Sequence, residues 1–329
     1  MDTVDTNAHG IILLCLPPFR LLPEFRELLL KAGDGRDVVV SMDRAEITSV
    51  LNRVEIGMGD VPFDLLPAMP RLKWLQLWSA GADFLQRFPE AKALPFQLTI
   101  TTGIHGQQMA EHFFTLLLAW TRRLPQALAA QQNHKWLFIQ DHDLITLNGK
   151  TMLIAGYGTI GRHIARIGQA FGMKVIGLRR NVPQADHAGG VQIEIFSKLK
   201  ELLPQAGYVV NVLPSTAETR RVFSAAEFGA MRPDALYISL GRGATTDQAA
   251  LTEALCRKHI AGALLDVFEC EPLPPDSPLW ALENVLITGH YAGCHPGYTK
   301  MAMAVALENL DRYKRGEPLN NVVDKRQGY

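Results

Sequence analysis

The sequence has little of what marks secreted, membrane-spanning or nucleic-acid-binding chains. Only 4 of its 329 residues are cysteine, and they are scattered with no C-x-x-C pair, which predicts free thiols in a reducing cytoplasm and no metal site. No apolar run reaches the roughly 20 residues that a membrane-spanning helix needs. The 33 basic and 33 acidic side chains give a formal net charge of +0, so no basic excess exists to hold nucleic acid or an anionic membrane. The opening residues, MDTVDTNAHG, have no basic flank beside a hydrophobic stretch, so we expect no signal peptide.

What the chain does have is a regular alternation of short apolar strands and amphipathic helices. This alternation predicts an α/β fold with parallel sheets covered by helices, and 329 residues, 47% of them hydrophobic, are enough for two domains. A largely apolar helix at 107–121 is expected to connect the domains, and the polar stretch at 122–140 to form an exposed arm. The strands expected before this helix lie at 11–16, 37–41, 72–77 and 97–101. Those expected after it lie at 152–155, 174–178, 208–213, 235–240, 260–265 and 285–288, with a final helix at 297–315.

The most informative segment is a glycine-rich turn between two of these strands. The strand at 152–155 runs into Gly156-Tyr157-Gly158-Thr159-Ile160-Gly161, and a helix-period stretch and a second strand follow. In a dinucleotide site Gly156 makes the tight turn, Gly158 lets the backbone approach a pyrophosphate, and Gly161 lets helix and strand pack closely. The helix that opens here directs unpaired N–H groups and its positive end at the phosphates. The bare pattern also fits an ordinary glycine-rich turn, but strand, turn, helix and second strand all have the spacing of a dinucleotide-binding unit.

Polar side chains follow three later strands, at the positions where open α/β sheets bind ligands. Arg242 lies between two glycines, Asp266, Glu269 and Glu271 follow the next strand, and His290 precedes a small-residue turn. An arginine fork suits a carboxylate, and small neighbours would let a substrate approach it. Taken singly, each segment also fits a plainer interpretation: a surface arginine in a turn, acidic residues that cap a loop, and a structural histidine.

Taken together, an arginine, a carboxylate and a histidine in this order behind a dinucleotide turn resemble the D-isomer-specific 2-hydroxyacid dehydrogenase family, in particular its glyoxylate/hydroxypyruvate reductases. The resemblance covers nearly the whole chain. It begins at WLQLWSAGADFL, which is similar to the family's substrate-carboxylate loop, passes through Ala110-Glu111-His112, and ends in GEPLNNVVDKRQGY. The resemblance implies hydride transfer between a nicotinamide cofactor and a small 2-oxo or D-2-hydroxy acid, with the reductive direction expected.

The resemblance also implies a role for each polar residue at the strand ends. His290 corresponds to the general acid/base on the C2 oxygen, and Glu271 to the carboxylate that stabilises its protonated ring and raises its pKa. Glu269 is the less favoured partner, because the family's carboxylate directly precedes a proline as Glu271 does. Arg242 corresponds to the residue that holds the substrate carboxylate and polarises its carbonyl.

Further residues are implied in substrate and cofactor binding. The amides of Ala80 and Gly81 would donate to the substrate carboxylate, and Asp266 would orient the nicotinamide carboxamide. Besides residues 156–161, the cofactor set comprises Arg179, Arg180, Leu213, Pro214, Thr219, Leu240, Gly241, Asp266, Ala292 and Gly293.

The chain departs from the usual pattern at two places. An NAD enzyme usually carries an acidic residue roughly 20 residues past the glycine turn, for the ribose 2′-hydroxyl. Here the second strand ends in Arg179 and Arg180, which would suit a 2′-phosphate, so NADP(H) is favoured over NAD(H). The alternative is a solvated arginine pair beside an NAD adenosine. The second departure is His105 in a loop where many members carry asparagine; it would contact substrate or make a hinge hydrogen bond.

The expected architecture is two doubly wound parallel-sheet domains. A flavodoxin-like substrate domain would comprise 1–103 and 292–329, a Rossmann cofactor domain would occupy 104–291, and the active site would lie in the cleft between them. The arm at 122–140 resembles the family's dimerisation region, so a homodimer is expected.

Two alternative functions remain open on sequence grounds. The same scaffold serves dehydrogenases of formate or phosphite, although the formate enzymes usually have glutamine in place of Glu271. It also serves as a dinucleotide-sensing co-repressor that binds peptides, against which the intact arginine–carboxylate–histidine set and the lack of a basic region argue.

Overall fold

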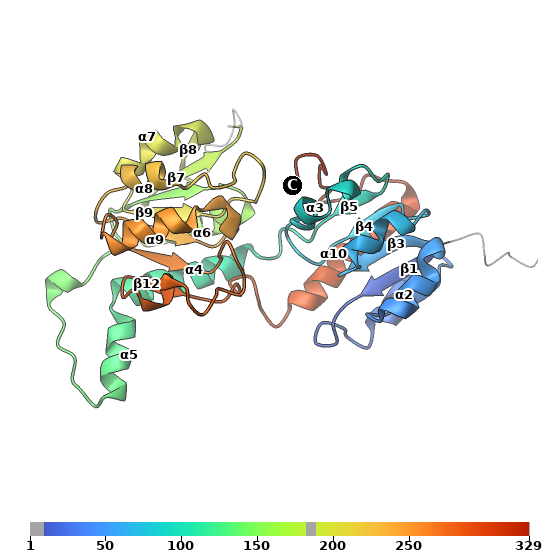
Figure 1. Cartoon of the computed structure of the whole chain (residues 1–329), viewed down its shortest axis with the longest axis horizontal. Coiled ribbons are helices and arrows are strands. Elements are labelled where there is room, and N and C mark those ends of the chain that lie inside the picture. Colours follow the sequence, from blue (N-terminus) through green and yellow to red (C-terminus); the bar gives the residue numbers. More distant parts are fainter. Residues whose placement is uncertain (1–9, 182–188, 329) are drawn as a thin grey trace, which may run out of the picture. The chain divides into compact units, whose positions relative to one another are not determined.

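The computed structural model describes residues 10–181 and 189–328. The chain divides into two compact units (Figure 1): unit 1 comprises 1–104 and 295–329, and unit 2 comprises 105–294. Each unit is an α/β structure built on its own parallel sheet.

Unit 1 contains a five-stranded parallel sheet in the order β2-β1-β3-β4-β5. Its strands are β1 (Ile11–Cys15), β2 (Val38–Val40), β3 (Val54–Gly59), β4 (Trp74–Gln76) and β5 (Gln97–Thr99). Helices α1 (Phe25–Ala32) and α10 (Tyr298–Arg315) pack on one face, and α2 (Arg44–Val50) and α3 (Phe84–Arg87) on the other. The sequence predicted every strand of this sheet except β3, to within two residues at each end.

Unit 2 contains a seven-stranded parallel sheet in the order β12-β11-β10-β9-β6-β7-β8. Its strands are β6 (Thr151–Ala155), β7 (Lys174–Arg179), β8 (Gln192–Ile195), β9 (Tyr208–Asn211), β10 (Leu236–Ser239), β11 (Gly262–Leu265) and β12 (Val285–Ile287). The chain enters at β6, runs outward through β7 and β8, and then returns to the other side of β6 at β9. The strand order therefore reverses between β6 and β9, which is where doubly wound folds bind their ligands.

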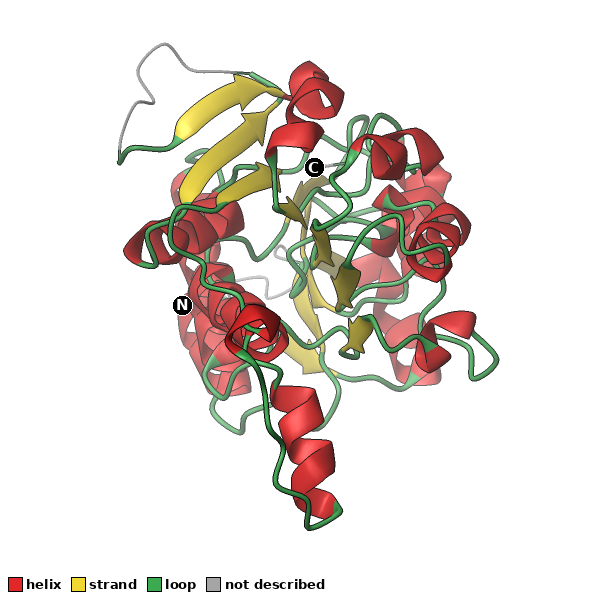
Figure 2. Cartoon of the chain, turned by 90° about the vertical axis from the view of Figure 1, so that its left-hand side faces the viewer, coloured by secondary structure: helices red, strands yellow, loops and turns green. Residues whose placement is uncertain are grey.

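The helices of unit 2 cover both faces of its sheet (Figure 2). Helices α4 (Gly106–Thr121) and α6 (Thr159–Ala170) pack on one face, and α7 (Leu199–Leu202), α8 (Ala225–Ala230) and α9 (Gln248–Cys256) on the other. The sequence did not predict β8, so the expected six-stranded sheet was wrong by this edge strand. None of the side chains of β8 is fully buried, and the strand lacks the apolar run that identified its neighbours.

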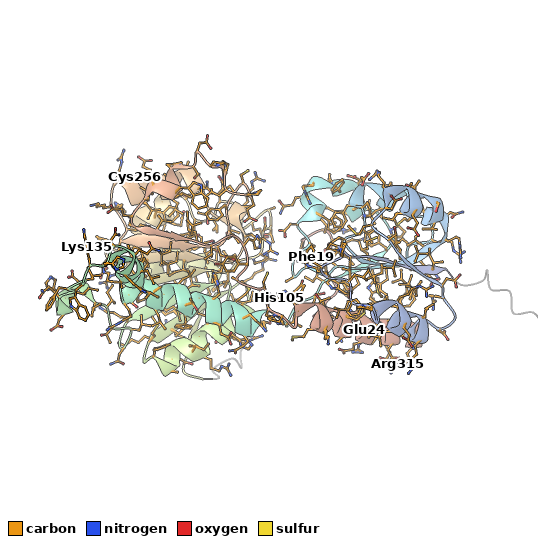
Figure 3. The ribbon with its side chains drawn as sticks, turned by 90° about the horizontal axis from the view of Figure 1, so that it is seen from below. Phe19, Glu24, His105, Lys135, Cys256 and Arg315 are labelled. Carbon is orange, nitrogen blue, oxygen red and sulfur yellow. The ribbon has the colours of Figure 1, made fainter. Side chains whose placement is uncertain are left out.

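The segment after α4 projects from unit 2 (Figures 1 and 2). Helix α5 (Leu124–Gln132) buries none of its residues, and the chain beyond it, which includes Lys135 (Figure 3), is largely extended. Trp136 and Phe138 are 89% and 80% exposed, so two large apolar side chains of this arm lie in solvent on the single chain.

Two further observations concern the described residues only. Across 10–181 and 189–328, no helix combines the length and hydropathy needed to cross a membrane. The same residues contain no group of three or more His, Cys, Asp or Glu side chains arranged to hold a metal ion. The four cysteines, of which only Cys15 is buried, form no disulfide.

Candidate active site

The glycine turn of unit 2 has the geometry of a phosphate-binding loop. Gly156 has a φ of +98°, and a Cβ there would lie 2.8 Å from the Val212 carbonyl oxygen. A Cβ at Gly161 would lie 2.9 Å from the carbonyl oxygen of Gly156, at the closest approach of α6 to the turn. A Cβ at Gly158, in contrast, would meet nothing within 4 Å. Two of the glycines are therefore required by packing, whereas the third leaves open space beside the N-terminus of α6, which starts with Thr159 and Ile160. These residues fit a dinucleotide pyrophosphate.

The end of β7 is bonded to the same turn. The amides of Gly156 and Tyr157 donate to the Leu178 carbonyl at 3.3 and 2.8 Å. Arg179 is half-buried and ends β7, while Arg180 is exposed and donates through Nη2 to Glu218 at 2.5 Å. Both arginines thus lie next to the glycine turn, where the adenosine ribose of a dinucleotide lies in this fold.

The loop after β9 is held by side-chain hydrogen bonds. The Thr219 hydroxyl donates to the Pro214 carbonyl at 2.6 Å and accepts from the Thr216 amide at 2.8 Å. Asn211, fully buried at the end of β9, accepts from the Leu213 amide at 3.2 Å and donates to the hydroxyl of Thr245 at 2.8 Å. The loop that carries Leu213, Pro214 and Thr219 is therefore tied to the loop after β10.

Arg242 is fixed by close backbone packing on both sides. Leu240 and Gly241 donate to the Asn211 carbonyl, and a Cβ at Gly241 would lie 2.6 Å from the Leu213 carbonyl oxygen. A Cβ at Gly243 would lie 1.9 Å from the carbonyl oxygen of Phe268. The structure shows that the two glycines let three loops approach one another. They bring Arg242 to the segment after β11.

His290 and Glu271 form a hydrogen-bonded pair at the ends of β12 and β11. The distance from His290 Nδ1 to Glu271 Oε2 is 2.6 Å, and the other carboxylate oxygen accepts from the Phe268 amide at 2.9 Å. His290 has a φ of +55°, in the left-handed region that residues other than glycine seldom adopt. Glu269 instead accepts from Arg221 at 2.9 Å, and it takes no part in the pair. The structure thus brings together the carboxylate and histidine that the sequence favoured.

The pair shifts the pKa values of both partners. The hydrogen bond to Glu271 raises the pKa of His290, against the opposing effects of burial and of the positive charge of Arg242. Burial by itself raises the pKa of Glu271, but the hydrogen bonds from His290 and the Phe268 amide outweigh it and leave the pKa lowered. Because Arg242 contributes to both shifts, its guanidinium lies close enough to act electrostatically on the pair.

Asp266 braces the backbone that follows His290. Its carboxylate is 1% exposed and accepts from the Tyr291 amide at 3.2 Å, the Ala292 amide at 3.1 Å and the Thr288 hydroxyl at 2.6 Å. His112 of α4 contacts the same hydroxyl through Nε2 at 3.0 Å, and burial lowers its pKa. The sequence predicted Asp266 for the nicotinamide but missed this bracing, as well as Thr288 and Asn211. The only feature of the sequence that could have identified Thr288 was its position two residues before His290.

The remaining predicted residues lie elsewhere in the two units. Gly293 follows the braced turn, and a Cβ there would be 3.1 Å from the ring of His105, the residue that precedes α4 (Figure 3). Ala80 and Gly81 belong to unit 1, in the loop beyond β4, where the Ser79 hydroxyl donates to the Gly81 carbonyl at 2.7 Å.

The fold and the site of unit 2 define the class of protein. A doubly wound parallel sheet with a glycine turn at the end of its first strand, together with a histidine paired with a carboxylate near an arginine, is the arrangement of a nicotinamide-dependent oxidoreductase.

Comparisons with known proteins specify the family. The model of the D-isomer specific 2-hydroxyacid dehydrogenase NAD-binding domain matches residues 114–292. The chain is 34% identical to a glyoxylate reductase of Korarchaeum cryptofilum over 83% of this chain and 82% of that one. Among solved structures, a D-isomer specific 2-hydroxyacid dehydrogenase family protein of Aeromonas salmonicida matches with a TM-score of 0.83 and 33% identity, covering 96% and 99% of the two chains. The NADPH-dependent glyoxylate/hydroxypyruvate reductase of Sinorhizobium meliloti, in complex with NADP and sulfate, also has a TM-score of 0.83, with 28% identity and 97% and 100% coverage.

The chain belongs to the D-isomer-specific 2-hydroxyacid dehydrogenase family. It is an NAD(P)-dependent oxidoreductase that reduces 2-oxo acids, and its two α/β units have the fold of the solved relatives.

The pKa shift of His290 leads to a test of the pair. We expect His290 to donate the proton for reduction, so kcat/KM for the oxo acid should be highest at low pH and fall as pH rises through the His290 pKa. Glu271→Gln removes the negative charge that raises this pKa. We expect the inflection in the pH profile to move to lower pH in Glu271→Gln. Steady-state kinetics with saturating cofactor across the pH range measure it, and an inflection at the wild-type pH would show that Glu271 does not set the proton affinity of His290.

Proposed function

We propose that this protein is an NADPH-dependent reductase of small 2-oxo acids of the glyoxylate and hydroxypyruvate kind. The observation that carries the proposal is the His290–Glu271 pair, 2.6 Å apart, with Arg242 acting on both partners from the end of the neighbouring strand. We assign cofactor binding to unit 2 and assign unit 1, which carries Ala80 and Gly81, to the substrate.

His290 supplies the proton in this reaction. A nicotinamide cofactor held at the glycine turn would supply the hydride for C2 of the oxo acid. As the carbonyl π bond breaks, its electron pair moves to the C2 oxygen, and the proton on His290 Nε2 is transferred to that oxygen. One hydride and one proton thus convert the 2-oxo acid into the 2-hydroxy acid. Glu271 accepts from Nδ1–H, which holds the ring and stabilises its charged form.

Arg242 holds the substrate for this transfer. A guanidinium can bind a carboxylate through two parallel hydrogen bonds and also places positive charge beside the carbonyl oxygen, where negative charge develops. The amides of Ala80 and Gly81, in unit 1, are assigned as donors to a substrate carboxylate. Asp266 is assigned to the nicotinamide carboxamide, in addition to bracing the His290 turn.

The substrate assignment rests on the relatives. Glyoxylate reductases of several archaea are at least 30% identical to this chain, and a glyoxylate/hydroxypyruvate reductase B of Escherichia fergusonii is 33% identical over 79% of this chain and 80% of that one. A panel of glyoxylate, hydroxypyruvate, pyruvate, phenylpyruvate and 2-oxoisocaproate, assayed with NADPH and with NADH, tests the assignment. Preference for a bulky oxo acid would overturn the substrate class, and binding of NADPH without turnover of any substrate would indicate a sensor.

The preference for NADPH rests on Arg179 and Arg180 at the end of β7. Strand β7 does not end in an acidic residue of its own that would accept from a ribose 2′-hydroxyl, and its two guanidinium groups can contact a 2′-phosphate. The related structures from Sinorhizobium meliloti and Xanthobacter autotrophicus are NADP and NADPH complexes, which supports the proposal.

Replacing Arg179 with Asp should reverse the preference. Charge-assisted hydrogen bonds contribute about 1.5–3 kcal/mol each, so the partly exposed pair should give the wild type roughly a tenfold to hundredfold preference for NADPH. A carboxylate at position 179 repels the phosphate and accepts from the 2′-hydroxyl of NADH. The measurement is kcat/KM for NADPH and NADH in both proteins, and equal use of the two cofactors by the wild type would refute the proposal.

We further propose that the protein acts as a homodimer in the cytoplasm. The exposed Trp136 and Phe138 of the arm provide an apolar surface for a second copy, and the scattered cysteines suit a reducing compartment. Sedimentation equilibrium at micromolar concentration would exclude the dimer if it gave the mass of one chain.

A further inference from the structure

We propose that Glu218 is a specificity-determining residue for the cofactor, because its carboxylate competes with a 2′-phosphate for the guanidinium of Arg180. This inference rests on the proposed binding of NADP(H) and identifies a residue that limits the preference for it. Neither the sequence pattern nor the family resemblance pointed to Glu218.

The position of the ion pair is set by the strand order of unit 2. Arg180 follows β7, and Glu218 lies in the loop after β9. In the sheet order β9-β6-β7 these two strands flank β6, whose end carries the glycine turn. The Arg180–Glu218 pair therefore spans two strand spacings, roughly 10 Å, across the end of β6. A dinucleotide bound at that turn places its adenosine ribose at the end of β7. The carboxylate thus meets the arginine at the edge of the proposed ribose site.

The loop delivers Glu218 from a fixed backbone. Thr216 and Thr219, on either side of Glu218, are 6% and 8% exposed. The amide of each donates to the hydroxyl of the other, at 2.8 and 3.2 Å, and the Thr219 hydroxyl also donates to the Pro214 carbonyl. These bonds close a tight loop around position 218, so the carboxylate stays within reach of Arg180 when the ion pair opens.

The ion pair is exposed enough for a cofactor to displace it. The Arg180 and Glu218 side chains are 44% and 72% exposed, and exposed pairs of this kind contribute little free energy. A 2′-phosphate carries more charge than a carboxylate and offers three acceptor oxygens, so it wins the competition for Arg180. Glu218 nevertheless remains close after displacement, where its charge repels the phosphate. The same carboxylate can accept from a ribose 2′-hydroxyl, and both effects lower the ratio of NADPH to NADH use.

The test is Glu218→Gln, which keeps the shape and removes the charge. Isothermal calorimetry with adenosine 2′-monophosphate and with adenosine measures the 2′-phosphate contribution without any turnover. We expect Glu218→Gln to bind adenosine 2′-monophosphate roughly threefold to tenfold more tightly than the wild type, with adenosine affinity unchanged or slightly weaker. The kcat/KM ratio of NADPH to NADH should rise by a similar factor.

The matched control is Asp234→Asn. Asp234 is also exposed and also pairs with an arginine, Arg232, at 2.7 and 2.8 Å. It precedes β10 and so lies at the amino ends of the strands, whereas Glu218 follows the carboxyl end of β9. Asp234→Asn changes the net charge by the same amount as Glu218→Gln, so a general electrostatic effect on nucleotide binding would appear in both variants. We expect Asp234→Asn to bind both nucleotides as the wild type does.

Dependence on Arg180 is tested by a double-mutant cycle. In an Arg180→Gln background, Glu218→Gln should raise adenosine 2′-monophosphate affinity by a clearly smaller factor than in the wild type, because the competition for Arg180 has gone and only the repulsion of the phosphate by Glu218 remains. An unchanged affinity in Glu218→Gln, or a gain equal to that of Asp234→Asn or independent of Arg180, would overturn the inference. None of these outcomes affects the proposed function, which fails separately if the wild type does not reduce glyoxylate or hydroxypyruvate with NADPH.

Discussion

His290→Ala is expected to reduce 2-oxo acids about 100-fold or more slowly than the wild type at saturating substrate. General acid–base catalysis contributes about this factor or more, and His290, paired with Glu271 at 2.6 Å, is the assigned proton donor to the C2 oxygen. The affinity for NADPH, measured by fluorescence titration, should stay within about twofold, because we assign cofactor binding to the glycine turn and β7 and not to the imidazole.

Two further variants keep this prediction sharp. His290 has a left-handed backbone, in which alanine is strained and asparagine is better tolerated, so His290→Asn should show the same loss of rate with a smaller loss of stability. His259→Ala removes an exposed histidine that lies just before β11, at the amino ends of the strands, whereas His290 follows the carboxyl end of β12. This substitution should leave the rate unchanged. If His290→Asn folds and turns over near the wild-type rate, another group supplies the proton.

Arg242→Lys is expected to lower kcat/KM for the oxo acid by at least roughly 30-fold, with NADPH affinity nearly unchanged. Lysine keeps the positive charge but loses the planar fork that can bind a carboxylate through two hydrogen bonds, each worth about 1.5–3 kcal/mol. Since the loss concerns substrate binding and carbonyl polarisation, both a raised KM and a lowered kcat should appear in initial-rate kinetics.

The matched control for this substitution is Arg232→Lys. Arg232 is exposed and pairs with Asp234 just before β10, whereas Arg242 follows the other end of that strand. Arg232→Lys should keep wild-type kinetics, whereas a wild-type kcat/KM in Arg242→Lys would exclude a bidentate carboxylate contact at position 242.

Local sequence patterns predicted most of the fold. Apolar runs bounded by glycine and proline identified all strands but β3 and β8, because a strand buried in a parallel sheet needs apolar residues throughout. The glycine turn could also be predicted from the sequence, because the tight turn and close contacts that require glycine involve residues that are near one another in the chain. The order of Arg242, Glu271 and His290 then pointed to the family, and the resemblance supplied the role expected of each.

Strand β3 shows what a local pattern could not reveal. It contains Glu55 and two glycines, so the search for apolar runs did not identify it, yet Glu55 is 3% exposed. Arg36 pairs with it at 3.1 Å and the Tyr313 hydroxyl donates to it at 2.8 Å. Burial raises the pKa of Glu55, but these bonds and one from the Gly10 amide outweigh that effect and bring it to about 2. A buried carboxylate is tolerated only because residues from distant elements neutralise it.

By itself, therefore, the sequence determined the α/β class, the dinucleotide turn and which residue types follow each strand. The tertiary structure decided which of those residues meet. It paired His290 with Glu271 and Glu269 with Arg221, closed Arg180 onto Glu218, and turned the Asp266 carboxylate to the backbone after His290. The members of each pair are 19 to 48 residues apart along the chain. Backbone propensity and periodicity act over a few residues, whereas these contacts depend on strand order and on loops that glycines allow to approach.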